Sequence, residues 1–166
     1  MKSALVVIDV QNHFAVEKAA DLPKKILEHI KKTKCDHVVF TKFLNVPSSN
    51  FHKILGYKQV MGPPATDIHP DIKHLTNAQN TFEKITYSAL KDLKFVNFLK
   101  KNKITELFIC GINIDGCVLA TAYEAFDLGY KIKILEELSS VASFRDDYEQ
   151  SAKTIIARNL KRKPKK

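Results

Sequence analysis

Three side chains suited to nucleophilic chemistry each stand where a predicted strand gives way to a loop or a helix. Asp9 ends the apolar run 4–9, and Lys84 ends a short strand-like stretch that opens into a loop. Cys117 begins a helix pattern just after the apolar strand 107–110. Because the carboxyl ends of parallel strands meet at one edge of a sheet, we expect the three side chains to face one crevice. An acid, an amine and a thiol in one crevice favour cysteine-dependent catalysis.

The position of Cys117 at the mouth of a helix bears on its reactivity. A free thiol has a pKa of about 8.5, so only a small fraction is ionised at neutral pH. We expect the positive helix end and the ammonium of Lys84 to favour the thiolate, with Asp9 accepting the thiol proton and returning it to a leaving amine. Structural interpretations are also open, since Cys117 could be a core cysteine, Asp9 a turn cap and Lys84 a solvated lysine.

The elements that must position these side chains alternate along the chain. The apolar patterns predict strands at about 4–9, 37–42, 80–84, 105–110 and 131–135, and helices at about 22–33, 91–102, 116–128 and 147–161. Such alternation predicts an α/β fold, a three-layer αβα sandwich with a central parallel β-sheet of Rossmann-like type. We assign residues 1–160 to a single domain and residues 161–166 to a basic C-terminal tail.

One long segment, residues 44–80, interrupts this alternation. It contains four of the six prolines, and loops of this length are usually functional. A short helix is predicted within residues 48–57. The sequence leaves open whether this loop or a neighbouring chain closes the pocket.

Three motifs, in order along the chain, resemble those of the isochorismatase-like cysteine hydrolases, a family that includes nicotinamidases and N-carbamoylsarcosine amidases. They are the opening segment 6–14 (VVIDVQNHF), the lysine segment 82–89 (FEKITYSA) and the nucleophile segment 110–118 (CGINIDGCV). The resemblance runs from about residue 5 to residue 140. It implies the same fold and a catalytic triad of Asp9, Lys84 and Cys117.

The resemblance also implies how the oxyanion formed on a substrate carbonyl would be bound. In the family the donors are two backbone N–H groups, which here belong to Asn113 and Cys117, with a cis peptide bond between Ile112 and Asn113. Losing one such donor typically costs roughly 3–4 kcal/mol of transition-state stabilisation.

Residues near the strand ends are expected to form the walls of a substrate pocket. Aromatic side chains there would exclude water and hold a flat or apolar acyl group, although ordinary packing explains them equally well. The predicted substrate-binding residues are Phe14, Phe43, Asn45, Tyr87, Ser88 and Ile112.

The chain departs from the family at the metal ligands. Nicotinamidase-type members carry Asp-x-His after the second strand and a later His, whereas this chain has Lys42 and Leu44 at the first two positions. Neither side chain is a ligand for zinc or magnesium. We therefore expect no metal and no cofactor, and the case for nicotinamide as substrate is weaker. His52, His69 and His74 match no ligand set and are expected to be exposed loop residues.

Composition excludes several other classes of protein. The chain has 166 residues, 45% of them apolar, but lacks the run of about 18 apolar residues that a membrane span needs. Three cysteines without a CxxC pair, and a start without the pattern of a signal peptide, predict a reducing, cytoplasmic location. The net charge of +9 is not accompanied by an RNA- or DNA-binding motif, so nucleic acid is not an expected partner. The charge weakly favours an anionic substrate.

The sequence thus predicts a cysteine-dependent amidohydrolase that cleaves a C–N bond of a small amide or ureide through a thioester on Cys117. The family resemblance also implies a homo-oligomer, either a dimer or a tetramer. Two alternatives stay open: a non-catalytic binding or redox-sensing module, and an isochorismate-type vinyl-ether hydrolase. An acid, a lysine and a thiol together favour the amidohydrolase, because a sensor needs no proton shuttle and vinyl-ether hydrolysis can dispense with the cysteine.

Overall fold

A computed structural model describes residues 2–161, and the predicted basic tail lies outside the described residues except for Lys161. The strands are β1(Lys2–Ile8), β2(His37–Phe43), β3(Thr81–Lys84), β4(Ile104–Ile112) and β5(Lys131–Ser140). The longer helices are α1(Leu22–Lys32), α4(Leu93–Lys101), α5(Leu119–Asp127) and α6(Asp146–Asn159). The short helical segments are η1(Glu17–Ala19), α2(Asn50–Lys53), α3(Pro70–Lys73), η2(Ala89–Lys91) and the π-helical turn η3(Ile114–Val118).

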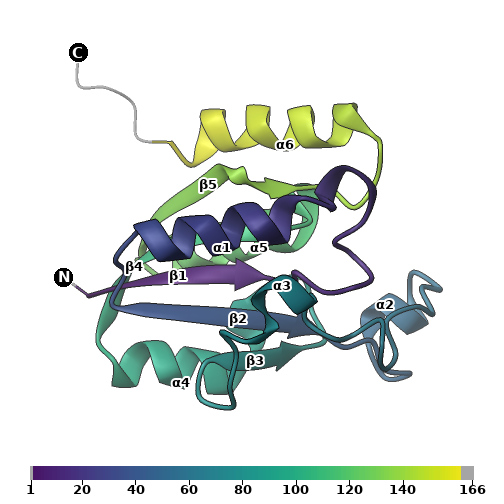
Figure 1. Cartoon of the computed structure of the whole chain (residues 1–166), viewed down its shortest axis with the longest axis horizontal. Helices are drawn as coiled ribbons and strands as arrows, with labels where there is room; N and C mark the ends of the chain where they lie inside the picture. The colour runs from purple at the N-terminus through teal and green to yellow at the C-terminus, as the bar shows by residue number, and fades with distance from the viewer. Residues whose placement is uncertain (1, 162–166) are drawn as a thin grey trace.

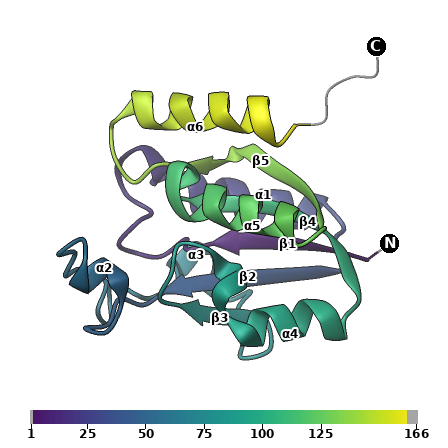
Figure 2. The same cartoon turned by 180° about the vertical axis from the view of Figure 1, so that it is seen from behind.

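The five strands form one parallel sheet in the order β3-β2-β1-β4-β5. Helices α1 and α3 contribute to the apolar cluster on one face of this sheet, and α4, α5 and α6 contribute to the cluster on the other. Figure 1 shows α1 in front of the sheet, and Figure 2 shows α5 in front when the molecule is turned. The predicted three-layer α/β fold with a central parallel sheet is confirmed.

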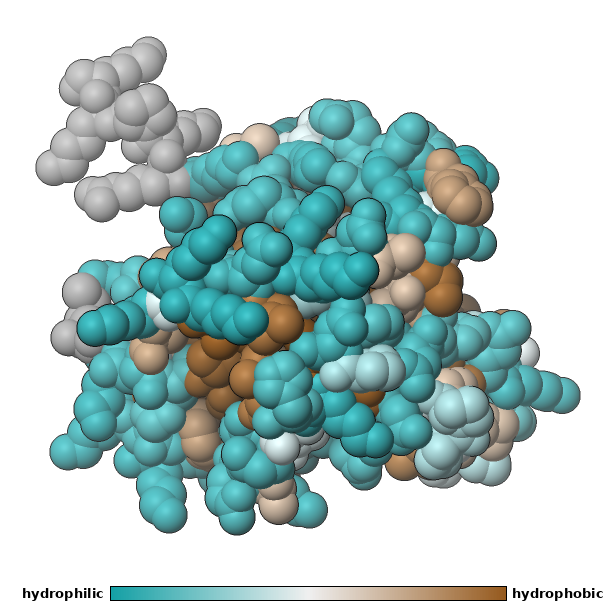
Figure 3. Space-filling view, viewed as in Figure 1, coloured by the Kyte–Doolittle hydropathy of each residue, from teal (hydrophilic) through white to brown (hydrophobic). Residues whose placement is uncertain are grey.

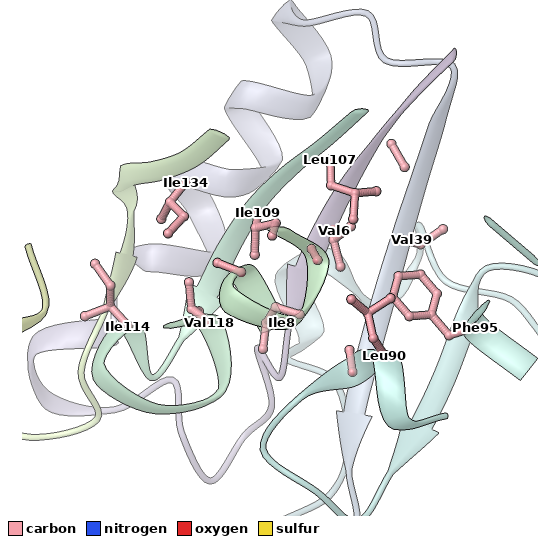
Figure 4. Close-up of a cluster of buried hydrophobic side chains, with 14 of the residues drawn as sticks. Val6, Ile8, Val39, Leu90, Phe95, Leu107, Ile109, Ile114, Val118 and Ile134 are labelled. Carbon is pink, nitrogen blue, oxygen red and sulfur yellow. The ribbon is translucent and has the colours of Figure 1, made fainter. Parts of the chain in front are cut away.

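The unbroken apolar run at residues 4–8 lies in β1, the central strand of the sheet. Successive side chains of a strand point to opposite faces, and both faces of this sheet are covered by helices. Val6 and Ile8 accordingly enter the cluster beneath α4 and α5, whereas Leu5 and Val7 enter the cluster beneath α1. Figure 4 shows the first cluster, in which Leu107 of β4 joins Val6 and Ile8.

Two features of the fold differ from the sequence-based expectation. Strand β5 continues to Ser140 because the register shifts opposite β4, so that Ile134 pairs with Ile109 but Ser139 pairs with Gly111. A bulge of this kind places the extra charged residues outside the ladder. Helix α3 was also not expected, whereas the short helix predicted within residues 48–57 is present as α2.

The molecular surface is predominantly hydrophilic on the face of α1, with an apolar area below that helix (Figure 3). Within residues 2–161, no helix is both long enough and apolar enough to cross a membrane.

Candidate active site

The ends of three elements bring the sequence-predicted acid, amine and thiol together. Asp9 directly follows β1, Lys84 is the last residue of β3, and Cys117 lies in η3 after β4. The ammonium Nζ of Lys84 lies 2.6 Å from Asp9 Oδ2 and 3.3 Å from Cys117 Sγ. Lys84 therefore connects the carboxylate to the thiol.

The carboxylate of Asp9 is held from the neighbouring strand. The hydroxyl of Thr41 donates to Asp9 Oδ1 at 2.7 Å, and the backbone N–H of Asp9 donates to Thr41 Oγ1 at 3.2 Å. Asp9 adopts a left-handed backbone conformation with φ of 49°, which Asp tolerates better than most residues. The side chain is 1% exposed, so these contacts fix its direction in the absence of solvent.

Gly111 allows β4 to pass close to the residue that precedes Asp9. Its φ is 123°, and a Cβ at this position would lie 2.1 Å from the carbonyl oxygen of Ile8. A side chain here would displace either β1 or β4 at the point where both strands reach the site. Glycine is therefore required by both sterics and backbone conformation.

Lys84 is charged although it is buried. Burial lowers its pKa, but the negative charge of Asp9 and the neighbouring Cys117 raise it by more, so the net pKa is raised. The ammonium also donates to the carbonyl of Thr86 at 2.8 Å and lies 5.3 Å from the ring centroid of Phe43. These contacts compensate the ammonium for its lost hydration.

The surroundings of Cys117 favour the protonated thiol over the thiolate. Burial raises its pKa, the carboxylate of Asp9 raises it further, and Lys84 lowers it by less, so the pKa rises to about 12. Burial is the largest cause of this shift, and the charge of Lys84 is shared with Asp9. Stabilisation of the thiolate by Lys84 during catalysis stays a prediction. The helical segment also begins at Ile114 as a π-helical turn, so Cys117 is not its first residue.

Two hydrogen-bonding residues fix the backbone around Cys117. Thr121 Oγ1 donates to the carbonyl of Cys117 at 2.7 Å and accepts from the N–H of Ala89 at 3.0 Å. Asn113 Oδ1 accepts from the N–H of Ala142 at 2.6 Å. The peptide bond between Ile112 and Asn113 is cis, as the family resemblance implied. The oxyanion-binding role of Asn113 and Cys117 stays a prediction.

A cavity of about 350 Å³ opens beside the thiol. Three of the predicted pocket residues, Phe14, Phe43 and Tyr87, lie on its wall. The cavity is lined by Phe14, Phe43, Phe51, Leu55, Tyr57, Tyr87, Asn113, Gly116 and Cys117.

The other three predicted pocket residues point elsewhere, which corrects the sequence-based assignment. The amide of Asn45 donates to the carbonyls of Tyr57 and Gln59, so this side chain holds the loop together. Ser88 accepts from the N–H of Leu90 and caps η2. Ile112 is 1% exposed and packs in the core cluster beneath α1.

The sequence reasoning missed the part of the wall that comes from segment 44–80. Phe51, Leu55 and Tyr57 lie on the cavity, at or just after α2. The spacing of Phe51 and Leu55, four residues apart, was the available signal, since it places both on one side of a helical turn. Gln11 was also missed: its buried side chain donates to the carbonyls of Phe43 and Thr66, which joins the end of β2 to this loop.

The residues that the family resemblance places at the metal-ligand positions do not fit a metal. Lys42 pairs with Glu83 at 3.2 Å, and Leu44 is apolar. His69 caps α3, accepting from the N–H of Asp71. Among residues 2–161, no three His, Cys, Asp or Glu side chains gather as a metal site would require. Metal-independent catalysis stays a prediction.

Known proteins share both the sequence pattern and the fold. The isochorismatase domain matches residues 3–160. Nicotinamidase/pyrazinamidase of Mycobacterium tuberculosis is 27% identical over an alignment of 165 positions, and this alignment covers 84% of this chain and 87% of that protein. The crystal structure of nicotinamidase/pyrazinamidase from Bacillus subtilis has a TM-score of 0.77 and 25% identity, covering 96% of each chain. That of N-carbamoylsarcosine amidase from Thermoplasma acidophilum has a TM-score of 0.76 and 24% identity, covering 96% of this chain and 92% of that one. The chain is therefore a hydrolase of the isochorismatase family.

Proposed function

We propose that the protein is a cysteine-dependent amidohydrolase, with Cys117 as nucleophile, Asp9 as general acid and base, and Lys84 as the group that stabilises the thiolate. The observation that carries the proposal is the position of the Lys84 ammonium, which contacts both Asp9 and Cys117 in a buried setting. An arrangement that serves only stability would not require a thiol beside the ion pair.

The resting protonation states define the first step. Asp9 takes the proton from Cys117 as Sγ attacks the carbonyl carbon of the amide, and Lys84 stabilises the negative charge that develops on sulfur. The carbonyl π electrons move to oxygen and form an oxyanion, which the backbone N–H groups of Asn113 and Cys117 would bind. When the C–N bond breaks, Asp9 returns the proton to the leaving nitrogen, which departs as ammonia or an amine.

Hydrolysis of the resulting thioester restores the protein. A water molecule gives a proton to Asp9 as its oxygen attacks the thioester carbonyl. The C–S bond then breaks, the carboxylic acid leaves, and Sγ of Cys117 recovers the proton from Asp9. Lys84 remains an ammonium throughout and fixes the direction of the carboxylate.

The chemistry of the cavity wall supports a small, uncharged amide or ureide as substrate. Among the described residues, those that line the cavity include no Lys, Arg, Asp or Glu. A charged substrate would lose hydration there without gaining an ion pair. The weak expectation of an anionic substrate, based on the net charge of +9, therefore finds no support at the site. Cytoplasmic location and a homo-oligomeric state stay predictions.

A panel of small amides and ureides, assayed by ammonia release, tests the proposal. At least one compound should be hydrolysed, and Cys117→Ala should abolish its turnover. Asp9→Asn should lower kcat by about 100-fold or more, which is typical for loss of general acid–base catalysis. Cys35→Ser is the matched control for thiol loss and should retain full activity. Full turnover by Cys117→Ala would instead favour the vinyl-ether type of hydrolysis, and binding without turnover would favour a non-catalytic module.

A further inference from the structure

The wall of the cavity is mainly apolar, but it includes the phenol of Tyr57, whose hydrogen-bond partner His13 does not itself line the cavity. Tyr57 lies on the wall, and its hydroxyl is 3.0 Å from Nε2 of His13. The two residues come from different parts of the chain, His13 from the segment after β1 and Tyr57 from the loop after α2. Neither takes part in the proposed proton transfers.

The backbone of Tyr57 is also held by hydrogen bonds. The carbonyl of Tyr57 accepts from the side-chain amide of Asn45 at 2.7 Å, and its N–H donates to the carbonyl of Phe51 at 2.9 Å. The position of the phenol is therefore determined from three sides. A polar group fixed in this way on an apolar wall recognises ligands by hydrogen bonding at little entropic cost.

The phenol lies close enough to Cys117 for a negative charge that develops on the sulfur to act on it. Burial raises the pKa of Tyr57, and the neighbouring Cys117 raises it further. The hydroxyl is thus neutral at physiological pH and shares one cavity with the nucleophile. A substrate whose carbonyl lies at Cys117 therefore occupies the cavity on whose wall Tyr57 lies.

From this geometry we infer that the Tyr57 hydroxyl, held by His13, is a polar subsite that selects substrates carrying an uncharged hydrogen-bonding group besides the scissile amide. A hydroxyl that accepts from His13 Nε2–H is free to donate its own proton to a ligand acceptor. With the other imidazole tautomer, the phenol donates to Nε2 and its oxygen accepts from a ligand donor. Ligands of similar shape without such a group leave the phenol without a partner in the cavity and bind more weakly.

The inference rests on the proposed function only in taking this cavity as the substrate site. Its test therefore measures binding without turnover, in protein carrying Cys117→Ala. The reference probe is benzamide. Pyridine-3-carboxamide and pyridine-4-carboxamide differ from it by a hydrogen-bond acceptor in the ring, and 3-hydroxybenzamide and 4-hydroxybenzamide differ from it by a hydrogen-bond donor. Dissociation constants are measured by calorimetry, with and without the additional substitution Tyr57→Phe.

At least one polar probe should bind about tenfold more tightly than benzamide, and Tyr57→Phe should reduce that ratio to about one while leaving benzamide binding unchanged within about twofold. Tyr87→Phe makes the same chemical change elsewhere on the wall, and the ratio should survive it. A purely structural role for Tyr57 would weaken all probes equally. Equal weakening, a ratio that Tyr57→Phe does not change, or no binding by any probe would overturn the inference. If the ratio of dissociation constants depends on Tyr57 but the unsubstituted protein hydrolyses no amide, the result would contradict the proposed function and leave this inference standing.

Discussion

The two halves of the active site are built in different ways. The strand-end half contains Asp9, Lys84 and Cys117, whose positions are fixed by the buried parallel sheet and by the ion pair, in which both side chains are 1% exposed. The loop half consists of residues from segment 44–80, among them Leu55, which is 60% exposed. The difference indicates that chemistry and substrate choice are separable, with the first determined by the sheet and the second by the loop.

The largest effect should be seen in the reactivity of the thiol toward iodoacetamide. Because the pKa of Cys117 is raised to about 12, the thiolate fraction should grow about tenfold for each pH unit from 7 to 10. Alkylation in a Cys35→Ser background should therefore accelerate about 1000-fold over this range without a plateau. Asp9→Asn should increase the rate at pH 7, because it removes a charge that raises the pKa. A plateau near pH 7 in the unsubstituted site would show that the resting thiol is already ionised.

Burial should decide how much each of two lysine ion pairs of the sheet contributes to stability. Lys84→Met leaves the buried carboxylate of Asp9 unpaired and should lower the free energy of unfolding by about 3–5 kcal/mol. Lys42→Met is the matched control, because its partner Glu83 is 59% exposed, and it should cost at most about 1 kcal/mol. Chemical denaturation at neutral pH measures both values. Equal losses would contradict the claim that burial distinguishes the catalytic pair.

The strand-end half was predictable from sequence and the loop half was not. Asp9 ends a continuous apolar run and Lys84 ends a short strand-like stretch. A parallel sheet brings such strand ends together whatever the intervening loops do. Residues 44–80 contain only short helices, and their conformation depends on tertiary hydrogen bonds such as those of Gln11. For that reason Asn45 was assigned to the pocket, although its side chain holds the loop, and Tyr57 was overlooked. The raised pKa of Cys117 was not predictable because the sequence does not show how the thiol is buried.

A smaller effect should come from the loop half alone. Phe51 packs against Phe43 at 4.7 Å and Tyr87 at 4.5 Å between ring centroids, and it lines the cavity. Phe51→Ala should raise KM about tenfold, equivalent to about 1.4 kcal/mol, and change kcat by less than about threefold. The pH dependence of Cys117 alkylation should stay as in the unsubstituted protein. A large fall in kcat would show that the two halves are coupled.

No effect is expected from metal removal. The family resemblance places Lys42 and Leu44 at the positions of metal ligands, and neither side chain binds zinc or magnesium. Dialysis against a chelator should leave turnover unchanged, and elemental analysis of purified protein should find no stoichiometric metal. If the chelator abolishes activity and added zinc, iron or manganese restores it, the protein binds a catalytic metal through residues other than these two.

The central claim is that Cys117 becomes acylated and that Asp9 moves the proton. Intact-protein mass spectrometry after rapid mixing with a hydrolysed amide tests it most directly. An adduct of the acyl mass should form on Cys117 and decay in step with product release. The adduct should form about 100-fold more slowly in Asp9→Asn and not at all in Cys117→Ala. Steady product formation without any adduct, undiminished in Cys117→Ala, would contradict the account.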